Sequence, residues 1–401
     1  MGNERIPLRV LGISSLPGGG MAGLSLVELM VALVIGLIGS LAITQVFTNS
    51  EAGRRAVGGG TDAQTNAAIG VYAIERDLQQ AGLGFTNPVA LGCQLRTNGV
   101  SPVINNLPLL PAAIIPAGVA AGDDNNQWGI PPGDPDSDMI IVSYGDPGVM
   151  LQGTPILANF AANPFRLTSG QGLTNHLGAY VLLAEQGQDC TLSRIQAVAA
   201  DDITAEYSAG VPYTSQGLGF NLGRQPRLLV YAVRNGRLTV CNFVEQPCNS
   251  AGAVADTAVW VPVVGDVAAL VAQHGWDTRP TKGIDANLVV DTFCKRRLGA
   301  SEACPGGETG LPSAGNRART QQQRACDSVR TPVIRFALVT RSSQAERNDV
   351  TPATITLWPD SAASPTTTGP VFNVPDQTFR YRVVTSTVPL RNMVWMKGAL
   401  C

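Results

Sequence analysis

The longest apolar run in the chain covers residues 24–47, where no charged side chain except Glu28 interrupts the sequence LSLVELMVALVIGLIGSLAITQVF. A helix rises 1.5 Å per residue, so this run would be about 36 Å long, enough to cross the hydrocarbon core of a bilayer. A secretory signal peptide has a shorter apolar region, roughly 7 to 15 residues, that ends at a small-residue cleavage site. The pattern therefore predicts a membrane-spanning helix over residues 24–50, with an uncleaved signal anchor as an alternative.

A second helical pattern follows at residues 51–84. Thr61-Asp62-Ala63-Gln64 has the spacing of a capping box, and apolar residues recur every three or four positions after it. The stripe consists of Ala67, Val71, Ile74, Leu78 and Ala81. Gly53 and the run Gly58-Gly59-Gly60 predict that the helix loosens or breaks before this stripe, while Gly82 and Gly84 predict its end. Such a stripe is typical of a helix that packs on a globular domain.

Beyond Phe85 the pattern changes to short apolar runs between turn residues, which is typical of strands. The runs are 139–144, 179–183, 227–233, 238–240, 259–264, 333–340 and 379–388. Asn235-Gly236 separates two of them and predicts a hairpin, because both central positions of a type I′ turn require positive φ. We expect one antiparallel sheet in an exported domain at residues 85–401, with residues 279–330 as a cysteine-containing loop insertion.

Composition and charge exclude several classes of protein. The net charge is −2 and only 14% of residues are charged, so no broad basic surface is available to bind nucleic acid phosphates. At 401 residues the chain is long enough for one large domain or two small ones. The 44 glycines and 27 prolines are spread without a repeat, which fits turns between short strands.

The cysteines predict disulfides. The eight are Cys93, Cys190, Cys241, Cys248, Cys294, Cys304, Cys326 and Cys401. Most lie outside close-spaced metal-binding pairs and only two histidines accompany them, so we expect no zinc site and no other metal or cofactor. An even count in an exported domain favours disulfides over free buried thiols, although eight cysteines allow 105 pairings. Cys241 with Cys248 is the one pair predicted, because only six residues separate them.

Glu28 distinguishes the apolar run from an ordinary membrane anchor. A carboxylate near the start of a spanning helix costs roughly 2.5 to 3.5 kcal/mol unless it has a partner. It stands five residues after Gly23, in the sequence GLSLVEL, which is the spacing of a type III signal sequence, and here the chain closely resembles type IV pilins and pseudopilins. The resemblance implies that residues 1–23 are a leader, that prepilin peptidase cuts between Gly23 and Leu24, and that the new amine is methylated. Leu24 departs from the phenylalanine that is usual at the first mature position.

Later segments resemble one branch of these proteins, the PilW family of type IV pilus assembly subunits. The matching segments are 74–78 (IERDL) with Ala81-Gly82, Ser137-Asp138, 231–238 (YAVRNGRL), 267–277 (VAALVAQHGWD), 333–341 (VIRFALVTR) and 387–392 (TVPLRN). They cover nearly the whole chain in the family's order. His274 departs from a tyrosine that is frequent in the family, and Thr278-Arg279-Pro280 replaces an acidic run.

No set of residues indicates catalysis. The chain has no G-x-S-x-G, H-E-x-x-H or Walker phosphate loop. His274 and Asp277 are residues that could serve as a catalytic base and the carboxylate that orients it, yet a structural histidine is the simpler interpretation. The run Asp134-Pro135-Asp136-Ser137-Asp138 begins like a calcium loop but lacks the later glycine and glutamate, so we expect a solvated acidic loop. Arg54-Arg55 fits the outer headgroup layer of a membrane.

Together these patterns predict an α+β, type IV pilin-like fold, in which a long N-terminal helix packs on an antiparallel sheet. The resemblance implies a minor pilin-like subunit without enzymatic activity, which primes or caps a pilus together with other minor pilins. It would be held in the inner membrane with its C-terminal domain in the periplasm until it joins a pilus at the cell surface. Its implied partners are other minor pilins, the major pilin, prepilin peptidase, the assembly platform and a tip adhesin. A type II secretion pseudopilin and a membrane-anchored periplasmic enzyme or binding module are the alternatives.

Overall fold

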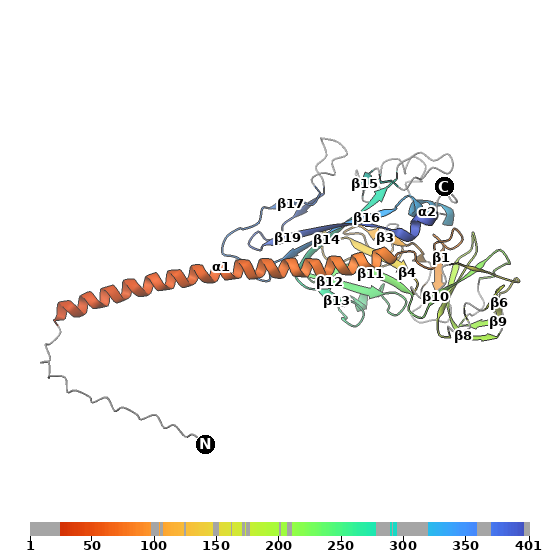
Figure 1. The fold of residues 1–401 in the computed structure, drawn as a ribbon, viewed down its shortest axis with the longest axis horizontal. Coiled ribbons are helices and arrows are strands. Elements are labelled where there is room, and N and C mark those ends of the chain that lie inside the picture. Colours follow the sequence, from red (N-terminus) through yellow and green to blue (C-terminus); the bar gives the residue numbers. More distant parts are fainter. Residues whose placement is uncertain are drawn as a thin grey trace, which may run out of the picture. The chain divides into compact units, whose positions relative to one another are not determined.

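A computed structural model describes residues 25–97, 104, 107–123, 126–146, 152–161, 163–170, 173, 177–199, 202–206, 211–277, 289–290, 292–294, 320–358 and 370–396 (Figure 1). The chain divides into two compact units, Met1–Arg55 and Ala56–Cys401. Helix α1 (Leu26–Gln80, 55 residues) contributes residues to both units. The fold is α+β, an apolar helix with a largely β-sheet body.

Within the N-terminal unit, the described residues are the first part of α1. The segment Leu26–Thr48 is long and apolar enough to cross a membrane, and none of its residues is buried. Large apolar side chains such as Leu26, Leu33 and Phe47 are more than half exposed. Gly23 and Leu24, the predicted cleavage position, lie outside the described residues.

The predicted interruption of α1 at its glycines is wrong, because the helix continues through Gly53 and Gly58-Gly59-Gly60. Glycine disfavours a helix by about 1 kcal/mol per residue but does not forbid it. Within the C-terminal unit, the missing side chains permit close packing. A Cβ on Gly59 would lie 3.0 Å from Ser342 Cβ, and one on Gly70 would lie 2.5 Å from Leu338 Cδ2. The predicted end is confirmed, since α1 stops at Gln80 and both Gly82 and Gly84 have positive φ.

The β-sheet body contains four sheets in the described residues, where one antiparallel sheet was predicted. The largest has the path β2-β1-β8-β7-β10-β5, with β9 paired to β8 and β6 paired to β9. Its strands are β1 (Gln94–Thr97), β2 (Leu107–Pro108), β5 (Thr154–Pro155), β6 (Phe165–Arg166), β7 (Tyr180–Ala184), β8 (Cys190–Ala199), β9 (Asp202–Ala205) and β10 (Leu218–Gly223). Strands β1 and β8 are parallel, so this sheet is mixed.

The other three sheets contain most of the predicted strands. A five-stranded sheet has the order β13-β12-β11-β4-β3, from β3 (Ala112–Ile115), β4 (Met139–Tyr144), β11 (Arg227–Arg234), β12 (Arg237–Asn242) and β13 (Val261–Val264). A four-stranded sheet has the order β15-β14-β16-β19, from β14 (Val267–Trp276), β15 (Thr292–Cys294), β16 (Val333–Arg341) and β19 (Tyr381–Pro389). Strands β17 (Thr354–Thr356) and β18 (Val371–Asn373) pair with each other. The predicted hairpin is confirmed, with Asn235 at φ 51° and Gly236 at φ 70° between β11 and β12.

The second half of α1 packs on the two sheets that contain β11 and β16 (Figure 1). Its predicted stripe is buried, with Ala67, Ile74, Leu78 and Ala81 fully so. Apolar side chains from β4, β11, β12, β14 and β16 complete this main core. A smaller core fills the end of the body formed by β6, β8 and β9.

Disulfides and a short helix fasten the loops of the body. Cys241 and Cys248, the pair predicted from the sequence, form a disulfide with their Cα atoms 5.9 Å apart, and Cys93 pairs with Cys190 at 5.7 Å. The predicted loop insertion 279–330 contains β15 and helix α2 (Gln321–Val329), and Cys326 in α2 is also disulfide-bonded. Arg324 of α2 donates from Nε to the carbonyl of Gly92 at 2.5 Å, beside Cys93.

Candidate functional site

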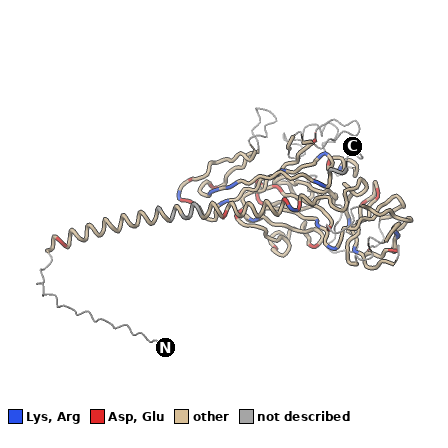
Figure 2. The backbone as a smooth tube through the Cα atoms, viewed as in Figure 1, with Lys and Arg blue, Asp and Glu red and all other residues tan. Residues whose placement is uncertain are grey.

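Glu28 is the acidic residue in the first turn of α1. No other charged residue occurs from Ser25 to Ser50, and Figure 2 shows the long uncharged stretch that follows it. The helix dipole favours a carboxylate at this end, but that contribution is only about 0.3 to 1 kcal/mol. It does not offset the cost of placing the charge in hydrocarbon, so an ionised Glu28 in a membrane needs either a cationic partner or a position at the headgroup level.

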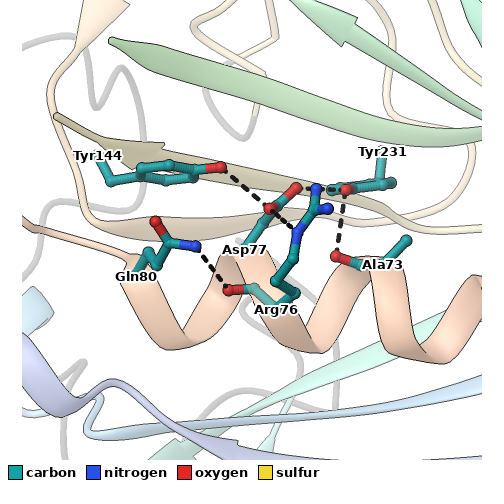
Figure 3. A network of polar contacts seen from close by, with 6 residues as sticks. All are labelled: Ala73, Arg76, Asp77, Gln80, Tyr144 and Tyr231. Carbon is teal, nitrogen blue, oxygen red and sulfur yellow. Dashed lines mark hydrogen bonds and ion pairs between the residues drawn. The ribbon is translucent and has the colours of Figure 1, made fainter. Parts of the chain in front are cut away.

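The second polar feature of α1 is Asp77, which lies on the buried face of the helix and is 1% exposed (Figure 3). Its Oδ1 accepts from the Tyr144 hydroxyl at 3.0 Å and from Arg76 Nε at 3.1 Å. Its Oδ2 accepts from the Tyr231 hydroxyl at 2.5 Å, and that hydroxyl also lies 3.3 Å from the Ala73 carbonyl oxygen. We call Asp77, Tyr144 and Tyr231 the helix clamp, because they join α1 to β4 and β11.

The electrostatics of the clamp follow from burial beside a carboxylate. Loss of solvent and the nearby Asp77 charge raise the pKa of both Tyr144 and Tyr231 well above the usual value near 10. The hydrogen bond to Asp77 and its negative charge raise the pKa of Arg76. The tyrosines therefore stay protonated as donors, and Arg76 stays cationic beside the carboxylate.

A cavity of about 570 Å³ opens over the helix clamp. It lies between the last turns of α1 and the strands of the five-stranded sheet. Its lining residues are Arg76, Asp77, Gln80, Tyr144, Asp146, Gln225, Arg227, Leu229, Tyr231 and Val240. The lining thus combines two arginines and two aspartates with the apolar side chains of Leu229 and Val240.

The acidic run Asp134–Asp138 is a turn that is exposed at Pro135 and Asp136, as predicted, but buried at Ser137 and Asp138. Asp134 accepts from the backbone N–H groups of Asn235 and Gly236 at 2.9 and 2.8 Å. Asp138 is fully buried and accepts from the N–H groups of Ala117 and Ala272 at 2.9 and 2.8 Å. These carboxylates fix the β11–β12 hairpin and β14, and the described residues contain no cluster of metal-binding type around them.

The remaining sequence candidates do not gather at one site. His274 is buried in β14 and Asp277 is buried directly after that strand. The N–H of Asp277 donates to the Arg330 carbonyl at 3.0 Å, so this aspartate lies where α2 ends. The side chains of Arg54 and Arg55 lie outside the described set.

The helix clamp is the polar site that sequence reasoning missed. Sequence reasoning used Asp77 only as part of the segment IERDL, one of the segments that resemble the PilW family. The available signal was the position of Asp77, three residues after Ile74 and therefore next to the apolar stripe of the helix. A carboxylate on a buried face requires hydrogen-bond donors. Nothing in the pattern could identify those donors as tyrosines 67 and 154 residues away.

Comparisons with protein-family models, with curated proteins and with solved structures found no match to this chain.

Proposed function

We propose that this chain is a minor pilin-like subunit of the PilW type, which primes or caps a type IV pilus together with other minor pilins. The observation that carries the proposal is the contrast within α1: Leu26–Thr48 is apolar and wholly exposed, whereas the second half is packed on a β body. A helix of that kind has two suitable environments, a bilayer and a bundle of similar helices.

Glu28 gives the proposal its chemistry. Cleavage between Gly23 and Leu24 creates an α-amine, which is cationic at neutral pH. In an apolar bundle, the amine of a neighbouring subunit and the carboxylate of Glu28 would neutralise each other, and removing one partner would leave a buried charge. The pair would fix the axial register between adjacent subunits. We also propose that another subunit lies on the tip side of this chain, because the Glu28 carboxylate needs the amine of such a subunit as its partner.

The proposed life of the protein has two stages. Residues 24–50 hold it in the inner membrane with residues 85–401 in the periplasm, where the disulfides form. It then leaves the membrane to join other minor pilins, the major pilin and a tip adhesin, after contact with prepilin peptidase and the assembly platform.

Processing is the first test. N-terminal sequencing of the protein from membranes should give a start at Leu24 with a methylated amine. Gly23→Val should leave Met1 intact and abolish pili, whereas Gly20→Val, in the same leader, should be cleaved normally. An intact Met1 in the unmodified protein, or normal pili with Gly23→Val, would contradict the proposal.

The role of Glu28 is tested separately. Glu28→Gln should be cleaved but should not enter the assembly, because a neutral amide cannot neutralise an amine in apolar surroundings. Glu51→Gln is the matched control and should assemble normally. Recovery of Glu28→Gln in purified pili at the level of the unmodified subunit would show that this carboxylate does not set the register.

A further inference from the structure

The four-stranded sheet of the body ends at β19, and no strand of the described residues lies beyond it (Figure 1). With nine residues, β19 is the longest edge strand in the described sheets. The other edge strands have only two to four residues. An edge strand presents a row of backbone N–H and C=O groups with which another strand can pair.

The ladder between β16 and β19 determines which backbone groups of β19 face outward. At the end of the ladder, the N–H of Ser342 donates to the carbonyl of Arg380 at 2.8 Å, and the pairing continues from there without a register shift. In an antiparallel ladder, hydrogen-bonded pairs alternate with pairs whose backbone groups point away from the partner strand. The even-numbered residues of β19 therefore bond to β16. The N–H and C=O groups of Val383, Thr385 and Thr387 point outward, and they form no hydrogen bond within the described part of the chain.

The middle of β19 lacks the features that usually protect an edge. Proteins shield edge strands with charged side chains, prolines or bulges. In β19 these features occur only near the ends, at Arg382 and Pro389, and the ladder contains no bulge. The stretch 383–388 between them is uncharged and free of proline, and both Thr385 and Thr387 are exposed. The outward backbone groups are thus accessible to another chain.

The opposite side of the same sheet is closed by the protein itself. Beside β14, the N–H of Leu270 donates to Ser137 Oγ at 3.0 Å, and the N–H of Ala272 donates to Asp138 Oδ2 at 2.8 Å. The N–H of Asp138 donates to the carbonyl of Leu270 at 2.7 Å. Strand β15 pairs with the last residues of β14. The body therefore satisfies the backbone groups on one side of the sheet and leaves those of β19 open.

Contacts with α1 show that β19 runs in the same direction as the packed half of this helix. A Cβ on Gly60 would lie 3.8 Å from Arg382 Nη2, near the start of β19. Asn392, just after β19, donates from Nδ2 to the carbonyl of Ala81 at 3.0 Å. Antiparallel pairs outnumber parallel pairs about two- to three-fold. Two copies of this chain joined by antiparallel β19 strands would have their Ala56 ends on opposite sides, although both apolar segments must enter one membrane. A second copy therefore does not fit this edge.

We infer that an extended segment of a different pilin-like subunit adds to β19 and extends this sheet by one strand. Its backbone pairs with the outward N–H and C=O groups of Val383, Thr385 and Thr387. In strand addition the main-chain hydrogen bonds supply affinity, and the side chains beside them supply specificity. This inference rests on the proposed function, and it identifies the surface of the body through which neighbouring subunits join.

Proline at position 385 tests the backbone pairing directly. Thr385→Pro removes one outward N–H and places a ring at the edge, but it removes no hydrogen bond to β16. Edge strands accept proline where the N–H would face solvent, so the body should still fold. Thr385→Ala removes the side chain and keeps the N–H, which makes it the matched control.

The experiment uses the full chain in its own membrane, with a photo-crosslinking amino acid at position 387. Side chains on neighbouring strands lie about 5 Å apart, within reach of the crosslinker. A second protein carries the crosslinker at Leu33, in the apolar segment. We expect adducts with a different pilin-like subunit from both positions. Thr385→Pro should lower the yield at position 387 about ten-fold, because a backbone hydrogen bond is lost and the ring obstructs pairing. It should leave the yield at Leu33 within a factor of two, and Thr385→Ala should leave both yields within that range.

The outcomes separate the inference from the proposed function. Adducts at Leu33 without adducts at position 387 would overturn strand addition and leave the pilin assignment standing. A lack of subunit adducts at both positions would count against both. Adducts at position 387 with a second copy of this chain would overturn the chosen partner. Equal losses with Thr385→Pro and Thr385→Ala would show that the side chain, and not the backbone, is recognised.

A folding control accompanies the proline variant. Tryptophan fluorescence of Thr385→Pro must match that of the unmodified protein. If it does not, Thr387→Pro with the crosslinker at position 385 makes the same test, because the N–H of Thr387 also faces outward. An unchanged yield with a folded proline variant would overturn the inference.

Discussion

Helix α1 contains two segments that bury their apolar residues in different ways. In Leu26–Thr48 the apolar side chains surround the helix and none is buried within the chain. In the segment that ends at Gln80, apolar residues form one stripe against the sheets, and a single carboxylate, Asp77, is buried among hydrogen-bond donors. The stability of the second segment is therefore set inside this protein, whereas that of the first depends on what surrounds it.

The acidic residues of the two segments, Glu28 and Asp77, differ in the same way. Asp77 has its donors in the same chain, so its role is complete in the folded body. The described part of the chain offers Glu28 no cationic side chain, since Ser25–Ser50 contains no lysine or arginine. If Glu28 is buried in an apolar bundle as we propose, its partner would have to come from another chain, whereas Asp77 has its donors within the body.

The largest effect is expected for Asp77→Ala. It removes the acceptor of two buried tyrosine hydroxyls and the partner of Arg76, which should lower the free energy of unfolding of the body by about 4 kcal/mol. All five tryptophans lie beyond residue 55, so tryptophan fluorescence during denaturation in detergent reports on the body. Asp62→Ala, at an exposed position of the same helix, should change the free energy of unfolding by less than about 0.5 kcal/mol. Equal effects would mean that the helix clamp contributes nothing particular.

The second prediction compares glycines of the two segments. Gly70→Val should lower the free energy of unfolding by about 3 kcal/mol, because its Cβ would meet Leu338 at 2.5 Å and both Leu238 and Val264 at 3.2 Å. Gly36→Val should leave the same fluorescence transition unchanged, since no atom lies within 4 Å of a Cβ there. A tolerated Gly70→Val would show that α1 can move away from the sheets at little cost.

These contacts also show where sequence reasoning succeeds. The stripe of α1, the Asn235-Gly236 hairpin and the strands β4, β11 and β16 follow from local periodicity and turn chemistry, which neighbouring residues determine. The interruption at Gly58-Gly59-Gly60 was predicted wrongly because the gain from close packing with Ser342 is a tertiary contact. The parallel pairing of β1 with β8 was missed for the same reason, since the partners lie 95 residues apart in Leu95 and Cys190. The tyrosine donors to Asp77 were missed for the same reason, because they lie 67 and 154 residues away.

The third prediction concerns pH. Tyr144 and Tyr231 have folded-state pKa values above their unfolded value near 10, so the stability they contribute is complete below pH 10 and is lost as pH rises above it. Each tyrosine that remains protonated only in the folded state should lower the free energy of unfolding by about 1.4 kcal/mol per pH unit. Because an unfolded tyrosine is only half ionised at pH 10, Tyr231→Phe should make that decline shallower by about 1 kcal/mol between pH 10 and 11. Denaturation curves of both proteins at pH 9, 10 and 11 provide the measurement, and parallel declines would contradict the assignment.

The smallest effect on the free energy of unfolding is expected on the outward face of α1, where the packed segment also carries exposed apolar side chains. Tyr72 and Ile69 are exposed like the residues of Leu26–Thr48, although they belong to the packed segment. Tyr72→Ala should therefore change the free energy of unfolding by less than about 0.5 kcal/mol, because an exposed side chain without a buried contact contributes little to folding. The matched substitution Tyr231→Ala, in the helix clamp, should cost about 3 to 5 kcal/mol. A large loss with Tyr72→Ala would mean that this side chain stabilises the body itself. A negligible loss would show that the folded body does not need this exposed side chain for its stability.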